Sequence, residues 1–236
     1  MSLKRRLSTP EGKKAYVRSL FATIADRYDL ITVVLSYGLD WRWKLRLVDL
    51  VHPDANARSL DLATGTGDIA FLLRRGCAHV IGLDVTQRMV ELARAKGSGA
   101  GSPAFLVGDM MTLPFADAQF DVVTTGYGLR NVPELTVALD EMLRVLKTGG
   151  QAVSLDFTRP SNPIVRTVYL WYLWAVGSAL GWVLHGDPDT YRYIPASLRG
   201  YPGADAMAAV MKVRGFRTVT SYPVMGGLMA IHHAVK

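Results

Sequence analysis

The segment at residues 60–67, Leu-Asp-Leu-Ala-Thr-Gly-Thr-Gly, carries the clearest chemical signal of the chain. An apolar run leads into a turn that contains Gly65 and Gly67, and Asp84 follows nineteen residues after Gly65. Small residues let the backbone approach a ligand, and a carboxylate about 20 residues further on is suited to bind a ribose diol. The segment therefore predicts a nucleotide-type cofactor site. Residues 65–70 also fit the loose dinucleotide pattern G-x-G-x-x-A, so the loop alone leaves NAD and S-adenosylmethionine open.

Acidic residues end the next two predicted strands. Asp84 ends the second strand, where the alternative to ribose binding is a cap for the helix at 86–96. Asp109 and Met110 end the third, where the acid can accept from an adenine amino group and Met110 can pack on the ring. The alternative there is an ordinary strand-end turn. Together with a helix C-terminal turn predicted at 149–150, this ordered set favours S-adenosylmethionine, because a dehydrogenase would not require it.

Strands alternate with amphipathic helices from residue 58 onward, which predicts a parallel sheet covered by helices. The last third ends in two strands that are joined closely enough to be antiparallel. A sheet that is parallel except for a terminal hairpin is the architecture of class I S-adenosylmethionine methyltransferases, so we predict this Rossmann-like α/β fold. The predicted strands are 58–63, 78–83, 103–107, 120–126, 150–158, 216–222 and 227–235, and the predicted helices are 68–75, 86–96, 134–146, 164–184 and 204–214.

The segment at 11–52 is predicted to be helical, because Tyr16, Leu20, Ile24 and Tyr28 recur every four residues. No linker rich in Ser, Gly or Pro divides the 236 residues, of which 50% are apolar. We therefore expect a helical cap or lid at 1–52 and a methyltransferase domain at 53–236, with a helical insertion at about 160–200.

The predicted helix at 164–184 is unusually apolar, with eighteen uncharged residues from Thr167 to Leu184. That length reaches the minimum for a membrane span. A span would place the final strands across the membrane from their sheet, and the run contains several Tyr and Trp residues. Two alternatives stay open: a helix buried in the protein, and a helix that lines an apolar substrate tunnel or contacts a bilayer surface.

Composition narrows the range of partners. The net charge of +7 suggests an anionic partner, such as a membrane surface, RNA or an acidic metabolite, although a soluble protein can simply be basic. Only the first eighteen residues are enriched in Lys and Arg, without the apolar run of a signal peptide, and no nucleic-acid motif is present, so neither export nor nucleic-acid binding is expected. The single cysteine fits a reducing cytoplasm. No metal site is expected from the histidines, which are His52, His79, His185, His232 and His233.

The segment Gly128-Leu129-Arg130-Asn131-Val132 closely resembles a motif of the ubiquinone/menaquinone-biosynthesis C-methyltransferase family, and so does Asp189-Thr190-Tyr191-Arg192-Tyr193-Ile194-Pro195. The resemblance covers about residues 11–235, including Tyr28-Asp29 and the ending from Gly226 to His232. It implies S-adenosylmethionine as the cofactor and a prenylated quinol as the substrate. The cofactor contacts that it implies are Thr66, Asp84, Asp109, Met110 and Gly126, beside Gly65 and Gly67 of the loop.

The resemblance also implies a mechanism, C-methylation of demethylmenaquinol to menaquinol or of the ubiquinone-pathway benzoquinol. Ring methylation requires an electron-rich quinol that loses a hydroxyl proton. Arg130 is expected to stabilise the phenolate or to hold a water that takes the proton, since arginine stays charged near neutral pH. Asn131 and Tyr28 are expected to orient the ring oxygens. Without the resemblance, Arg130 could equally form a structural ion pair with a strand-end carboxylate.

Several positions depart from the family pattern and leave the exact quinol open. They are Ile31-Thr32 for Met-Asn, Asp40 for His, Gly126 for a frequent Ser, Thr148 for Pro, and Asp156-Phe157-Thr158 for Glu-x-Ser. The competing hypotheses are a related methyltransferase for another aromatic or lipid substrate, a non-catalytic cofactor-binding scaffold in a quinone-assembly complex, and an integral membrane protein. A prenyl tail further implies a cytoplasmic enzyme with peripheral contact to an anionic membrane; a homodimer is a further expectation.

Overall fold

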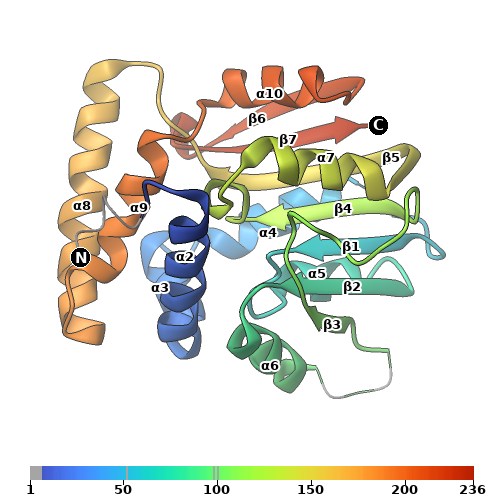
Figure 1. Ribbon diagram of the computed structural model, residues 1–236, viewed down its shortest axis with the longest axis horizontal. Coiled ribbons are helices and arrows are strands. Elements are labelled where there is room, and N and C mark those ends of the chain that lie inside the picture. The colour runs from blue at the N-terminus through green and yellow to red at the C-terminus, as the bar shows by residue number, and fades with distance from the viewer. Residues whose placement is uncertain (1–6, 52, 98, 100) are drawn as a thin grey trace.

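The computed structural model describes residues 7–236 except 52, 98 and 100. A single sheet runs through the molecule in the order β3-β2-β1-β4-β5-β7-β6 (Figure 1). All pairings among β1 to β5 are parallel, whereas β7 lies antiparallel between β5 and β6. The predicted parallel sheet with a terminal antiparallel hairpin is therefore confirmed. The strands are β1 (Arg58–Leu62), β2 (His79–Asp84), β3 (Ala104–Val107), β4 (Phe120–Gly126), β5 (Leu146–Phe157), β6 (Thr218–Val224) and β7 (Met229–Val235).

Helices cover both faces of the sheet because successive strand residues point to opposite sides. Val122 and Val123 illustrate this alternation, since they belong to separate hydrophobic clusters. The cluster around Val123 includes residues of α7 (Leu135–Val145) and α10 (Ala204–Val213). The cluster around Val122 includes residues of α4 (Asp40–Asp49), α5 (Asp68–Leu73) and α6 (Gln87–Lys96). The order of the strands reverses between β1 and β4, which places the typical ligand crevice at their carboxyl ends.

A layer of further helices lies beyond these carboxyl ends (Figure 1). It contains α2 (Pro10–Ile24), η1 (Ala25–Arg27), α3 (Tyr28–Leu35), α8 (Pro163–His185) and α9 (Asp189–Arg199). The helix α2 begins where Thr9 accepts a hydrogen bond from the amide of Gly12 at 3.1 Å, with Pro10 in the first turn. Helix α4 packs on the sheet instead, with Trp43 and Leu47 in its core. The division at residue 52 stays a prediction, and residue 52 lies outside the described residues.

Helix α8 contacts the protein along one narrow stripe. Its buried residues are Tyr169, Leu173, Gly177 and Gly181, four positions apart on one face. A Cβ at Gly177 would lie 3.0 Å from the carbonyl oxygen of Tyr191, so the glycines allow the chain around α9 to approach closely. Only 22% of the apolar window is buried, so of the open alternatives the structure does not show a helix buried in the protein. By length and composition alone, α8 is a helix that could cross a membrane.

The turn at Gly149 and Gly150 does not end a helix, contrary to the prediction. Helix α7 ends at Val145, and β5 begins directly at Leu146, which pairs with Phe120. Gly149 has a φ of 77° and donates its amide to the carbonyl of Lys236 at 3.0 Å. The glycines therefore belong to an irregularity within β5, at the register shift opposite Phe120 and Val122.

Candidate active site

A pocket of about 660 Å³ lies at the carboxyl ends of β1, β2 and β4, and we call it the glycine-loop pocket. Helix α2 covers it with Lys14, Val17 and Phe21. Because the three strand ends meet here, residues far apart in the sequence share one cavity. The predicted residues that line it are Tyr28, Gly65, Asp84, Asp109, Met110, Gly126 and Asn131.

The backbone of the glycine loop is held in left-handed conformations. Gly65 has a φ of 56° and Gly67 a φ of 90°, which glycine adopts at little cost. A Cβ at Gly65 would lie 3.5 Å from the Tyr28 ring, and both residues line the pocket. Ala63 and Tyr127 also have positive φ values, of 51° and 60°, and both line the pocket. Such strain in non-glycine residues concentrates at functional sites, and the sequence analysis did not predict the positive φ of either residue.

Asp84 connects the glycine loop to the end of β2. Its carboxylate accepts from the amide of Gly65 at 2.9 Å and from the amide of Thr86 at 2.8 Å. Thr86, and not Asp84, occupies the N-cap position of α6, so the capping alternative is not what the structure shows. Burial raises the pKa of Asp84, and the two amides act against this by stabilising its ionised form. Each oxygen retains a lone pair for a further donor.

Asp109 forms an ion pair that the sequence did not suggest. Its Oδ2 lies 2.6 Å from Nζ of Lys14 on α2, and its Oδ1 accepts from the amide of Met111 at 2.9 Å. The strand-end turn is therefore present, and the carboxylate still lines the pocket. Met110 is buried beside it. The sequence indicated only that the N-terminal segment containing Lys14 is basic. It did not identify Asp109 as the partner, because the two residues are far apart in the sequence.

Three predicted cofactor residues, Thr66, Gly67 and Gly126, either do not line the pocket or are closely packed by a neighbouring side chain. Thr66 and Gly67 are not among the described residues that line the pocket. The Thr66 hydroxyl donates to Asp29 at 2.6 Å and accepts from Lys96 at 2.9 Å, which fixes the loop against α3 and α6. Gly126 does line the pocket, but a Cβ there would lie 2.7 Å from Cδ1 of Ile69. A serine would therefore require Ile69 to move.

A second pocket of about 630 Å³ adjoins the first, and we call it the apolar pocket. Phe21, Tyr28 and Tyr127 line both pockets and so form the boundary between them. The rest of its wall is mainly aliphatic and aromatic, and Arg130 contributes the positive charge. The remaining wall includes Leu20, Ile24, Ile31, Leu35, Phe157 and Tyr193.

Arg130 forms the buried ion pair that the sequence left as an alternative. Its Nε lies 3.0 Å from Oδ1 of Asp156, and its amide donates to Oδ2 at 3.2 Å. Its guanidinium lies over the Phe157 ring at 5.2 Å and also donates to Ser197 at 3.1 Å. Burial raises the pKa of Asp156 to about 6, although the nearby Arg130 charge opposes that shift. The pair still leaves Arg130 on the wall of the apolar pocket.

Asn131 is used mainly to shape the loop after β4. Its Nδ2 donates to the carbonyl of Tyr127 at 2.7 Å, and its Oδ1 accepts from Arg130 at 3.2 Å. A Cβ at Gly128 would lie 2.4 Å from the Thr125 hydroxyl, so the loop requires glycine there. Lys13 of α2 donates to the carbonyl of Val132 at 2.6 Å. The helical layer is therefore fixed to this loop by direct hydrogen bonds.

The boundary tyrosines differ in their partners. Burial raises the pKa of Tyr28 to about 12, so its phenol stays protonated at neutral pH. Tyr127 donates to Oδ1 of Asp40 at 2.6 Å, and Asp40 pairs with Lys44 at 2.5 Å. Lys44 in turn lies 2.9 Å from Asp68 at the start of α5. Asp40, where the family pattern has His, thus holds one wall of the site through Tyr127.

No group of three or more His, Cys, Asp or Glu side chains is placed to hold a metal ion in the part of the chain that the structure describes. His52 lies outside that part.

Comparison with known proteins agrees with this geometry. The sequence model of the ubiE/COQ5 methyltransferase family matches residues 9–236. The demethylmenaquinone methyltransferase of Thermus thermophilus is 41% identical over 216 residues, covering 90% of this chain and 98% of that protein. The ubiquinone/menaquinone biosynthesis C-methyltransferase UbiE of Roseobacter denitrificans is 35% identical over 235 residues, covering 97% and 94%.

Solved structures support the fold. A SAM-dependent methyltransferase from Thermotoga maritima superposes with a TM-score of 0.69 at 20% identity, covering 93% of this chain and 99% of that one. At this identity the likeness shows the architecture alone, which is the predicted class I methyltransferase fold. The family match extends over nearly the whole chain and over the loop from Gly128 to Val132. This chain therefore belongs to the ubiE/COQ5 methyltransferase family.

Proposed function

We propose that this protein is an enzyme that transfers a methyl group from S-adenosylmethionine to a ring carbon of a prenylated quinol. The observation that carries the proposal is the pair of adjoining pockets, one polar at the glycine loop and one apolar beside Arg130. The relatives named as demethylmenaquinone methyltransferases support demethylmenaquinol as the substrate and menaquinol as the product. The relatives named UbiE make the benzoquinol of ubiquinone synthesis the second candidate.

The residues of the glycine-loop pocket fit S-adenosylmethionine. The left-handed Gly65 leaves free the space that a Cβ would take, next to the Tyr28 ring. Asp84 has free lone pairs for a ribose, and Asp109 with Met110 offers an acceptor and a soft apolar surface for an adenine. Gly126 lines the same wall, while Thr66 and Gly67 would hold the loop from behind. When bound, the cofactor supplies a methyl group activated by a sulfonium.

The chain's own residues would then orient the ring and favour transfer of its hydroxyl proton to a water molecule. Arg130 faces the apolar pocket as a buried cation, which stabilises a phenolate more strongly there than in water. Tyr28 stays protonated and can donate a hydrogen bond at the boundary between the pockets. Asn131 acts indirectly, because its side-chain amide forms hydrogen bonds with the Tyr127 carbonyl and the Arg130 guanidinium.

The test uses purified protein, labelled S-adenosylmethionine and two chemically reduced substrates, a prenylated demethylmenaquinol and its benzoquinol counterpart. We expect label in the naphthoquinol product, and none when the oxidised quinones are supplied. Label in the benzoquinol alone would change the substrate assignment. Binding of S-adenosylhomocysteine without labelling of either ring would overturn the proposal in favour of a scaffold, and label in an unrelated aromatic or lipid would favour a redirected methyltransferase.

We further propose that the exposed side of α8 and α3 binds the surface of an anionic bilayer, and that the enzyme acts at the inner face of the cytoplasmic membrane. Large apolar side chains are exposed on both helices, and Trp171 and Trp182 are more than 65% exposed. Tyr37, just after α3, hydrogen-bonds to Tyr172 on α8, so these segments form one surface. Exposed Trp and aliphatic residues are typical of membrane interfaces, and the net charge of +7 favours anionic lipid. This surface comprises Leu30, Val33, Val34, Trp171, Trp174 and Trp182.

Sedimentation with vesicles containing anionic lipid tests this surface. Replacing Trp171 and Trp182 by Ala should release the protein from the vesicles at low salt. Val213 on α10 provides the matched control, because it is 83% exposed and lies outside this surface. Wild-type protein that does not sediment with vesicles would refute the proposal. A dimer that dissociates in the Trp variants would instead assign the surface to a second copy of the chain.

A further inference from the structure

Two buried tyrosine hydroxyls have no hydrogen-bond partner among the described residues, those of Tyr193 and Tyr201. Leaving a buried polar group unpaired destabilises a protein, so such groups call for an explanation. Both phenols lie near the Arg130–Asp156 pair, whose charges affect the pKa of each. The two tyrosines thus have the same chemistry and similar burial, but they differ in their access to the site.

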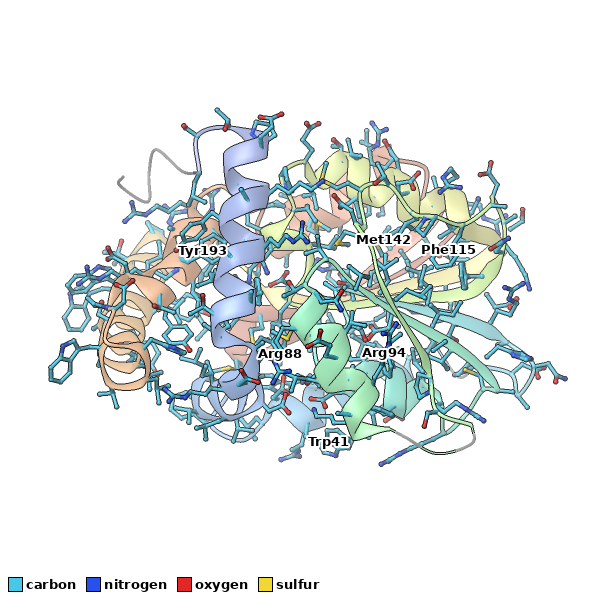
Figure 2. The ribbon with its side chains drawn as sticks, turned by 60° about the horizontal axis from the view of Figure 1, so that its bottom comes forward. Trp41, Arg88, Arg94, Phe115, Met142 and Tyr193 are labelled. Carbon is cyan, nitrogen blue, oxygen red and sulfur yellow. The ribbon has the colours of Figure 1, made fainter. Side chains whose placement is uncertain are left out.

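Tyr193 lines the apolar pocket together with Arg130, whereas Tyr201 lines neither this pocket nor the glycine-loop pocket. Tyr193 belongs to α9 and its side chain is only 2% exposed. Figure 2 shows it between α9 and α2, where its ring lies 5.4 Å from the Tyr16 ring. The ring is therefore fixed by packing. Tyr193 thus contributes to the pocket wall, while its hydroxyl has no partner and almost no exposed surface in this structure, so a ligand oxygen would reach it after a small shift of the neighbouring side chains.

We propose that the Tyr193 hydroxyl donates a hydrogen bond to a ring oxygen of the quinol, on the same wall of the apolar pocket as Arg130. This inference rests on the proposed function and adds a substrate-contacting residue to it. An apolar pocket with two donors on one wall selects a ring that carries an oxygen over an unsubstituted ring of the same shape. The prenyl tail gains nothing from these donors, so they recognise the ring.

The chemistry of Tyr193 suits this role in the reacting state as well. Burial raises its pKa above the ordinary value, so the phenol remains a donor throughout the reaction. A hydrogen bond to an ionised oxygen is stronger than one to a neutral hydroxyl. The Tyr193 hydroxyl therefore stabilises the phenolate more than the bound quinol, which raises the rate of methyl transfer and not only the affinity.

The test compares Tyr193→Phe with Tyr201→Phe. A hydrogen bond to a charged group is worth about 1.5–3 kcal/mol, so kcat/KM for the quinol should fall about 10- to 100-fold in Tyr193→Phe. Affinity for S-adenosylhomocysteine and the unfolding temperature should not fall, since the lost hydroxyl has no protein partner. Tyr201→Phe should keep wild-type kinetics. Wild-type kinetics in Tyr193→Phe, or equal losses in both variants, would overturn the inference.

Binding without turnover separates this inference from the proposed function. Affinity for the reduced quinol is measured in the presence of S-adenosylhomocysteine, with the same prenylated ring lacking both hydroxyls as the control ligand. Tyr193→Phe should weaken binding of the quinol and leave binding of the control ligand unchanged. Wild-type protein that binds quinol with this dependence but does not methylate it would refute the proposed function alone. Wild-type protein that prefers the control ligand would refute both.

Discussion

Replacing Arg130 tests whether its ion pair with Asp156 is structural, catalytic or both. The two side chains are 7% and 5% exposed and their atoms lie 3.0 Å apart, so Arg130→Met leaves a buried carboxylate without its partner. Breaking a buried pair in this way costs about 3–5 kcal/mol of folding stability. In a chain of this size, each kcal/mol lowers the unfolding temperature by about 2–4 °C. We therefore expect a loss of roughly 6–20 °C.

The double variant Arg130→Met with Asp156→Asn separates the two roles. Asn removes the unpaired charge, and its oxygen can still accept from the backbone amide of Phe157, which donates to Asp156 at 2.8 Å. Its NH₂ then faces the backbone amide of residue 130, which donates to the other oxygen of Asp156 at 3.2 Å, so only part of the lost stability should return. Turnover should stay about 100-fold or more below wild type, as is typical when a donor to a developing oxyanion is removed. Affinity for S-adenosylhomocysteine should stay within about threefold of wild type, because Arg130 lies outside the glycine-loop pocket.

The assay combines thermal unfolding, single-turnover methylation of the reduced quinol and calorimetric titration of S-adenosylhomocysteine. Arg214→Met is the control, because Arg214 and Asp140 form a pair that is more than a third exposed. Such a pair contributes about 0–1 kcal/mol. If the double variant recovers turnover together with stability, Arg130 is a structural residue and the phenolate argument is refuted. Equal losses of turnover and cofactor affinity would refute it as well.

Three further predictions concern the glycine loop and its surroundings. Gly128→Ala forces a Cβ against the Thr125 hydroxyl and should lower the free energy of unfolding in urea by about 1–3 kcal/mol. Gly200→Ala is the control and should not destabilise the protein, because a Cβ there has no neighbour within 4 Å. Equal effects of the two changes would contradict the packing argument. Asp84→Asn turns an amide NH₂ toward one of the two backbone amides that Asp84 binds, so affinity for S-adenosylhomocysteine should fall about tenfold or more, while Glu91→Gln on the exposed side of α6 should bind normally. Burial raises the pKa of Asp61 to about 7, so the stability that this carboxyl contributes in acid is lost as pH rises from about 4 to about 7. Asp61→Asn should abolish that loss, so the stability of the variant relative to wild type should grow between about pH 4 and about pH 7 and level off above it. Parallel pH profiles would contradict the assignment.

The parts of the site that the sequence predicted are those that depend on local pattern and topology. Asp84 and Asp109 each follow an apolar strand, and the carboxyl ends of adjacent parallel strands must meet at one edge of the sheet. The alternation of strands and helices therefore fixed their approximate place. The loop from Gly128 to Val132 could be placed in the same way, because it follows β4 directly.

The parts that the sequence did not predict are pairings between distant segments. Lys14 reaches Asp109 from α2. A pair of Arg130 with a strand-end carboxylate was an open alternative, but the sequence did not identify Asp156 as its partner. Charged residues of each sign are common along the chain, so composition offers no basis for choosing among partners. Tyr193 shows the same limit, because the absence of a partner for a buried hydroxyl is a property of the packed structure. A sequence motif can identify such a residue, but it does not show which group the side chain contacts.

The spacing of its glycines indicates which side of α8 faces the protein, although the helix is apolar on all sides. A helix that is apolar on every side has no polar face to show which side is buried. The two glycines, Gly177 and Gly181, lie four residues apart and carry the information, since small residues at that spacing mark where another backbone approaches. They continue the stripe of Tyr169 and Leu173 that faces the protein. This stripe accounts for the buried contacts of α8 with the described part of the protein, and the exposed tryptophans on its other sides are the observation from which we propose the bilayer contact.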